Sequence, residues 1–203
     1  MFWYKYHKYK IGYRSLNVNT TGLNNTSIGT NALQVSQTGS SNKSIGINSL
    51  LSNVNGSNNS AFSDGSLYAS TNNNNTAIGM VSLITLQNGS NNTAIGSNSG
   101  KTLYSGTNNT FLGSNTSSST TSLSSSTAIG YNSQVTSSNQ IVLGTSLEST
   151  IIPGSMTCVG ASNFTNINCA GSMNITSTNA NLRIGFQSFS ANTTGLQNTS
   201  YGT

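Results

Sequence analysis

The sequence predicts an all-β protein built as a parallel β-roll or β-solenoid with a coil period of 17. The first observation behind this prediction is a marker dipeptide, an aliphatic residue followed by glycine, at Ile28, Ile45, Ile78, Ile95, Leu112 and Ile129. Most successive markers differ by 17 in residue number, as from Ile28 to Ile45. The second is alternation of apolar and polar residues between Asn-Gly or Thr-Gly turns, with no convincing helical period. Short repeats of this kind stack on copies of themselves, because a single unit cannot bury its apolar side.

Composition favours ordered β-structure over disorder. Only 4% of the 203 residues are charged and 33% are hydrophobic, and Pro153 is the single proline. Disordered segments usually keep charge and proline, whereas the apolar residues here are periodic. Beyond the first ten residues, four cations face two carboxylates, too few to neutralise a run of phosphates, so no nucleic-acid partner is expected. No stretch reaches the roughly 18 apolar residues of a membrane span.

The marker divides the chain into segments. Residues 1–10 form an aromatic and basic leader, for which a docking peptide, a membrane-surface anchor, an end cap and an accidental extension all remain open. Residues 11–138 hold the solenoid repeats. The pair Leu143-Gly144 follows Ile129-Gly130 at a spacing of 14 instead of 17, and this change marks a neck at residues 139–154. Residues 155–183 lack the marker and are predicted as a β-stem.

The repeat begins again near the end of the sequence. Residues 192–203 match residues 19–30 at ten of twelve positions, and residues 184–189 resemble residues 11–16 at the same offset of 173. Residues 184–203 are therefore predicted to start a second repeat module. We expect the chain to be one segment of a longer array.

Two columns of equivalent residues are the candidate structural sites. The aliphatic residue of each marker is expected to face the interior, and the following glycine to permit a tight corner or a positive φ. Three residues before the marker an asparagine recurs, and stacked amides of this kind can hydrogen-bond along the solenoid. The predicted core ladder is Ile28, Ile45, Phe62, Ile78, Ile95, Leu112 and Ile129. The predicted polar ladder is Asn25, Asn42, Asn59, Asn75, Asn92 and Asn109.

No catalytic, cofactor or metal site is predicted. The chain has one aspartate, one glutamate and one histidine, which are Asp64, Glu148 and His7. The two acids lie about five coils apart, whereas the carboxyls of glycoside hydrolases lie roughly 5 to 9.5 Å apart. Cys158 and Cys169 have no metal-ligand spacing, and both free thiols and a disulfide between neighbouring coils remain open.

The repeats resemble a known family. Residues 91–96, Asn-Asn-Thr-Ala-Ile-Gly, and residues 126–133 resemble the head repeats of trimeric autotransporter adhesins and related fibre repeats of phages and large DNA viruses. Residues 139–154 resemble the neck that ends such heads in viral and phage fibres. The resemblance covers residues 11–154 and again 184–203, and it implies a left-handed roll, a homotrimer and a role in attachment. The adhesin period is shorter than 17, so this coil is expected to carry a longer loop.

The expected function is structural and non-enzymatic. We expect a fibre segment of a virion or cell-surface appendage, located on the virion surface or in the extracellular space, that contributes to host or surface attachment. Its expected partners are copies of itself, further fibre modules, and host glycans or receptors. One alternative is a carbohydrate-binding or carbohydrate-processing tailspike-like protein, which needs acidic residues in a groove. Another is an ice-binding solenoid, disfavoured because the residue two after each threonine is the expected core isoleucine.

Overall fold

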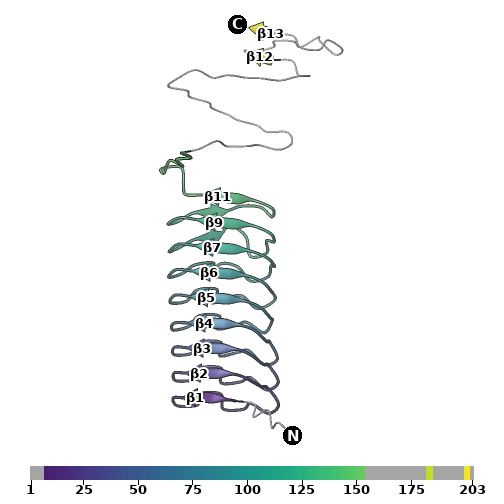
Figure 1. Ribbon diagram of the computed structural model, residues 1–203, viewed down its shortest axis with the longest axis vertical. Helices are drawn as coiled ribbons and strands as arrows, with labels where there is room; N and C mark the ends of the chain where they lie inside the picture. Colours follow the sequence, from purple (N-terminus) through teal and green to yellow (C-terminus); the bar gives the residue numbers. More distant parts are fainter. Residues whose placement is uncertain (1–6, 154–181, 185–198, 202–203) are drawn as a thin grey trace. The chain divides into compact units, whose positions relative to one another are not determined.

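The computed structural model describes residues 7–153, 182–184 and 199–201. All regular structure in these residues is β-strand, and no helix occurs among them. The chain divides into two units, Met1–Ile151 and Ile152–Thr203, which are described separately. The first unit is a parallel β-solenoid of about eight coils, in which successive coils contribute one short strand each to a nine-stranded sheet (Figure 1).

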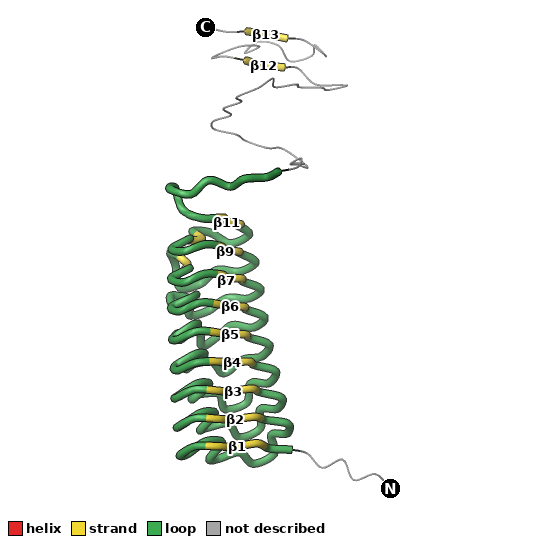
Figure 2. The backbone as a smooth tube through the Cα atoms, turned by 60° about the vertical axis from the view of Figure 1, so that its left-hand side comes forward, coloured by secondary structure: helices red, strands yellow, loops and turns green. Residues whose placement is uncertain are grey.

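The nine strands stack one upon another along the axis of the solenoid (Figure 2). Each pairs in parallel and in register with its equivalent in the next coil, for example Thr76 opposite Thr93 and Ile78 opposite Ile95. Six of the eight pairings join residues 17 apart; β4 and β5 are 16 apart, and β9 and β11 are 14 apart. The strands are β1 (Tyr9–Ile11), β2 (Thr26–Ile28), β3 (Lys43–Ile45), β4 (Ser60–Phe62), β5 (Thr76–Ile78), β6 (Thr93–Ile95), β7 (Thr110–Leu112), β9 (Thr127–Ile129) and β11 (Ile141–Leu143). A two-stranded sheet joins β8 (Ser117–Ser118) to β10 (Gln134–Val135).

The sheet extends beyond both expected limits of the repeat region. Its first strand, β1, begins at Tyr9 inside the expected leader, and its last, β11, lies inside the expected neck of residues 139–154. Residues 1–6, most of the expected stem, and Cys158 and Cys169 lie outside the described residues. In the second unit, β12 (Leu182–Ile184) pairs in parallel with β13 (Thr199–Tyr201), and the pairing of Leu182 with Thr199 repeats the spacing of the first unit.

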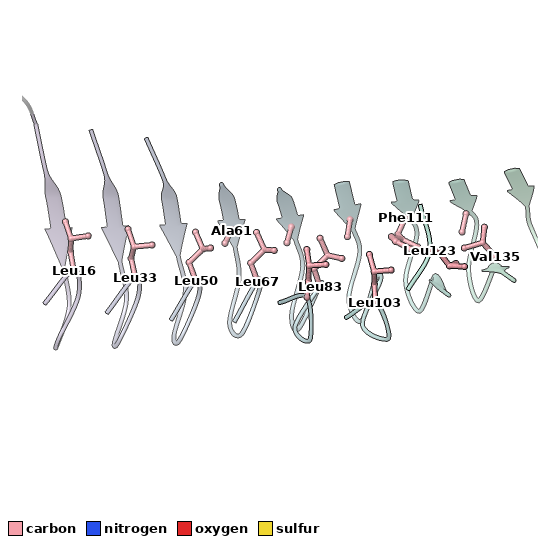
Figure 3. Close-up of a cluster of buried hydrophobic side chains, with 14 residues drawn as sticks. Leu16, Leu33, Leu50, Ala61, Leu67, Leu83, Leu103, Phe111, Leu123 and Val135 are labelled. Carbon is pink, nitrogen blue, oxygen red and sulfur yellow. The ribbon is translucent and has the colours of Figure 1, made fainter. Parts of the chain in front are cut away.

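The interior of the solenoid is narrow and is filled from two sides. The middle residue of the short strand is buried in β2 to β7 and in β9, and in most of these strands it is small, as at Ser44, Ala61 and Ala77. The turn after the strand contributes one buried leucine in each of the first five coils, and these leucines repeat along the stack (Figure 3). The buried apolar residues are Leu16, Ala32, Leu33, Leu50, Ala61, Leu67, Ala77, Leu83, Leu86, Ala94, Leu103, Phe111, Leu123, Ala128 and Val135.

The structure corrects the expected position of the aliphatic marker residues. They stack in register, but their side chains lie on the outer face of the sheet. Ile45, Ile78, Ile95, Leu112 and Ile129 are 36% to 43% exposed. Alternation along a strand places the marker and its middle neighbour on opposite faces. Because leucines from the turns occupy the interior, only a small middle residue fits opposite them. The predicted core-ladder residues whose side chains face outward in the single chain are Ile28, Ile45, Phe62, Ile78, Ile95, Leu112 and Ile129.

The corners of the coils depend on residues with positive φ. The glycine of the marker adopts this conformation as expected: Gly79 has a φ of 125°, and a Cβ there would lie 2.5 Å from the carbonyl oxygen of Gly96. The core leucines Leu33, Leu50 and Leu83 have φ values of 48° to 49°. That backbone conformation costs an L-residue roughly 1–2 kcal/mol. Full burial of a leucine side chain contributes about 1.5–3 kcal/mol, which offsets the cost.

The sixth coil departs from the pattern of the first five, and two positions compensate for each other there. Gly100 occupies the leucine position, with a φ of 64°, and Phe111 occupies the middle position of the next strand, β7. A Cβ at Gly100 would lie 2.8 Å from Leu83 Cδ2 and 3.0 Å from Phe111 Cδ2. The buried phenyl ring therefore fills the space that a leucine occupies in other coils.

We expect Phe111→Ala to lower the free energy of unfolding by about 3–5 kcal/mol, because it opens a cavity in the core. Gly100→Leu alone should also destabilise the fold, since its side chain would collide with Phe111. The double variant restores the leucine-and-alanine pairing of the other coils and should recover most of the loss. Denaturant unfolding of the four proteins measures this coupling. A double variant no more stable than Phe111→Ala would contradict the compensation between Gly100 and Phe111.

Candidate functional site

The candidate functional site is the outer surface of the nine-stranded sheet, which we call the strand face. It comprises three positions per coil: the marker residue and the residue two before it, which lie on the same side of each strand, and the residue two after the marker, which follows the bend at the marker glycine. The marker column contains nine apolar side chains in register, and none of them is buried. These side chains are Ile11, Ile28, Ile45, Phe62, Ile78, Ile95, Leu112, Ile129 and Leu143.

The two columns beside the markers differ in chemistry. The column before the markers is mainly half-buried threonine, as at Thr76 and Thr93. The column after the markers includes four large exposed side chains of apolar or aromatic character, Tyr13, Ile47, Met80 and Tyr131. The strand face is therefore more apolar along its second edge than along its first.

Two charged residues interrupt the described part of the strand face. Lys43 replaces a threonine in the column before the markers and is exposed. Asp64 lies in the column after the markers and is also exposed. The backbone N–H of Ile47, one coil earlier, donates a hydrogen bond of 2.7 Å to Asp64 Oδ1. The aspartate carboxylate is thereby held toward the coil that contains Lys43.

The asparagine column expected from the sequence lies inside the coil, where all six residues are essentially inaccessible to solvent. Each side-chain oxygen accepts the backbone N–H of the equivalent residue in the next coil, as from Asn92 to Asn75 Oδ1 at 3.0 Å. Each side-chain nitrogen donates to a backbone carbonyl near the start of the next coil, as from Asn92 to Gly106 at 2.9 Å. Every amide is thus satisfied from both sides without water, and the column connects coils as backbone pairing does. The residues are Asn25, Asn42, Asn59, Asn75, Asn92 and Asn109.

The residue before each buried asparagine has a different role that the sequence reasoning did not assign. Asn58, Asn74, Asn91 and Asn108 are exposed and have φ values of 59° to 60°. Asparagine tolerates this left-handed conformation better than most residues. The Asn-Asn dipeptide therefore contains one corner residue and one interior ladder residue, and the enrichment of asparagine at positive φ could have indicated the first.

The acidic residues do not come together in the described solenoid. Asp64 follows β4, and Glu148 follows β11, five strands further along the sheet. At about 4.8 Å per strand they are roughly 24 Å apart along the axis, beyond the spacing of paired catalytic carboxyls within one chain. The side-chain hydroxyl and the backbone N–H of Thr145 both donate to Glu148, and they hold its pKa below the ordinary value. Among the described residues, no three His, Cys, Asp or Glu side chains cluster as metal ligands.

Comparisons with known proteins leave the family of this chain open. No family model, curated protein or solved structure matches it. Among the residues that the structure describes, no helix has the length and apolar character needed to cross a bilayer.

The buried ladder predicts a pH-dependent cost for Asn92→Asp. An ionised carboxylate would place an oxygen against the carbonyl oxygen of Gly106, so burial should raise the pKa of the new carboxyl well above its unfolded value of about 3.9. The variant should approach wild-type stability below about pH 4 and lose about 3 kcal/mol or more as pH rises through the folded pKa. The matched control is Asn91→Asp, since Asn91 is exposed and aspartate tolerates its φ. Urea unfolding across pH measures both, and equal effects would contradict a buried role for Asn92.

Proposed function

We propose that the chain is a segment of a homotrimeric fibre on a virion or cell surface, and that its copies pack through the strand face. The observation that carries the proposal is the column of nine apolar side chains, in register, on the outside of the coil. The interior has its own apolar and polar columns, so the marker residues are not needed to fill it. Contiguous exposed apolar patches of several hundred Å² usually mark an interaction surface.

The strand face has the dimensions of such a surface. Nine strands spaced about 4.8 Å apart extend roughly 40 Å, and three extended residues span about 10 Å, which gives on the order of 400 Å² per chain. At about 25 cal/mol per Å², its burial would contribute on the order of 10 kcal/mol per chain before the costs of association. This contribution is large enough to support a stable oligomer.

The number of copies and the left-handed sense of the coil come from the resemblance of the repeats to adhesin heads and viral fibre repeats. Three chains around one axis would place each strand face toward the other two and remove it from water. Attachment would then fall to surfaces outside the strand face. The loops of residues 97–106 and 114–125 are the candidates there, apart from their first residues at the edge of the strand face, because the sequences of the coils differ most in these loops.

Ile95→Glu tests the assembly. The glutamate would replace an outward side chain and introduce a charge into the proposed interface, while the core of the coil stays intact. We expect the wild-type protein to run at three times the chain mass in light scattering, and the variant to run as a monomer with an unchanged β-sheet circular dichroism spectrum. Val18→Glu is the control, since Val18 is 41% exposed against 38% for Ile95 and lies outside the strand face. A monomeric wild-type protein would refute the proposed assembly, and equal dissociation of both variants would refute its location.

The outward position of the marker residues also supports a second candidate function. The objection to ice binding was that the residue two after each threonine lies in the core, yet Thr76 and Ile78 share the outer face. A regular array of outward threonine and isoleucine side chains is a surface on which water can order. Thermal hysteresis of the wild-type protein, with Thr93→Lys as the disrupting variant, measures this function. The absence of thermal hysteresis would exclude the ice-binding function.

A further inference from the structure

We propose that Lys43 of one copy pairs with Asp64 of the neighbouring copy, and that this pair sets the alignment of the chains. The inference rests on the proposed assembly through the strand face. Its starting point is that these two residues are the charged members of a face that is otherwise apolar or hydroxylic in the described solenoid.

The two residues lie on opposite edges of the strand face. Lys43 begins β3 and belongs to the column before the markers, whereas Asp64 follows β4 and belongs to the column after them. Parallel copies arranged cyclically about one axis contact each other head to tail, so the first edge of one copy meets the second edge of the next. An antiparallel pair would bring each edge against its own equivalent. A cation on one edge and a carboxylate on the other therefore favour parallel copies.

The charged groups of Lys43 and Asp64 also lie at matching positions along the solenoid axis. Asp64 lies one coil after Lys43, but its Oδ1 accepts the N–H of Ile47, which belongs to the coil of Lys43. This bond holds the carboxylate between the two coils and leaves Oδ2 for a partner. A lysine side chain, with its flexible four-carbon stem, can cover the remaining part of a coil spacing of about 4.8 Å. Copies aligned without any shift along the axis would thus bring the two groups together.

A repetitive interface needs a feature that fixes the alignment of the copies along the axis. Most coils present the same threonine and aliphatic residues, so a copy displaced by one whole coil would still find a complementary apolar surface. A one-coil displacement would bring Asp64 opposite Thr26 or Ser60, the neighbours of Lys43 in its column, and leave both charges unpaired. An exposed ion pair contributes little by itself, but an unpaired charge in an apolar interface is costly. The pair therefore discriminates between alignments more than it adds affinity.

Charge reversal tests the pair. We expect Lys43→Glu and Asp64→Lys each to weaken trimer formation at least tenfold at low salt, measured by sedimentation or light scattering over a dilution series. The double variant Lys43→Glu/Asp64→Lys should recover most of the loss, and high salt should shrink the differences. Lys101→Glu is the matched control, because it reverses an exposed lysine outside the strand face.

The outcomes separate this inference from the proposed function. A wild-type monomer would overturn both. A wild-type trimer with single reversals indistinguishable from Lys101→Glu, or a double variant no better than the singles, would overturn the pair alone. Recovery in the double variant, with weakened singles, would support it.

Crosslinking tests the parallel alignment directly. Lys43→Cys and Asp64→Cys are made in separate chains that also carry Cys158→Ser and Cys169→Ser, and the chains are then assembled together. With a short thiol-to-thiol crosslinker, we expect covalent dimers from the mixture and none from either chain alone. Crosslinking of Lys43→Cys chains to each other, or no crosslinking in the mixture of assembled trimers, would overturn the alignment.

Discussion

In-register pairing between successive coils is the interaction on which the rest of the structure depends. A strand of three residues has no stability by itself, but nine of them pair continuously along the axis. The buried asparagine side chains extend the same pairing into the interior, because each amide bonds to the equivalent residue of the next coil. A substitution at one position therefore affects its neighbours above and below more than residues elsewhere in its own coil.

The narrow interior follows from this stacking and determines what the surface presents. Each of the first five coils contributes one buried leucine from its turn, and most of the strands contribute one small buried residue. Where Gly100 takes the place of the leucine, Phe111 supplies the missing volume from the next strand. Larger aliphatic residues cannot share this space, so the marker residues face outward and create the apolar strand face.

The strand face links the fold to the proposed function. Its regularity provides area for association, but it provides little information about alignment, because most coils look the same to a partner. In the proposed assembly, the irregular residues carry that information. Lys43 and Asp64 lie on opposite edges of the face in adjacent coils, near the slightly shorter coil in which Ser60 pairs with Thr76.

The sequence alone determined the period, the position of the short strand that ends at each marker from Ile28 to Ile129, the glycine corners and the asparagine column, because each depends on local backbone preferences or on identity between coils. It could not determine which side of the strand faces inward. In Thr-Ala-Ile, alternation allows either alanine alone or threonine and isoleucine together to face the interior. Only the tertiary structure decided this, since leucines such as Leu83, which follows the marker Ile78 in the same coil, fold back and fill the interior. The continuation of the sheet through β11 was likewise decided by pairing with β9, which tolerates the shortened coil between Thr127 and Ile141.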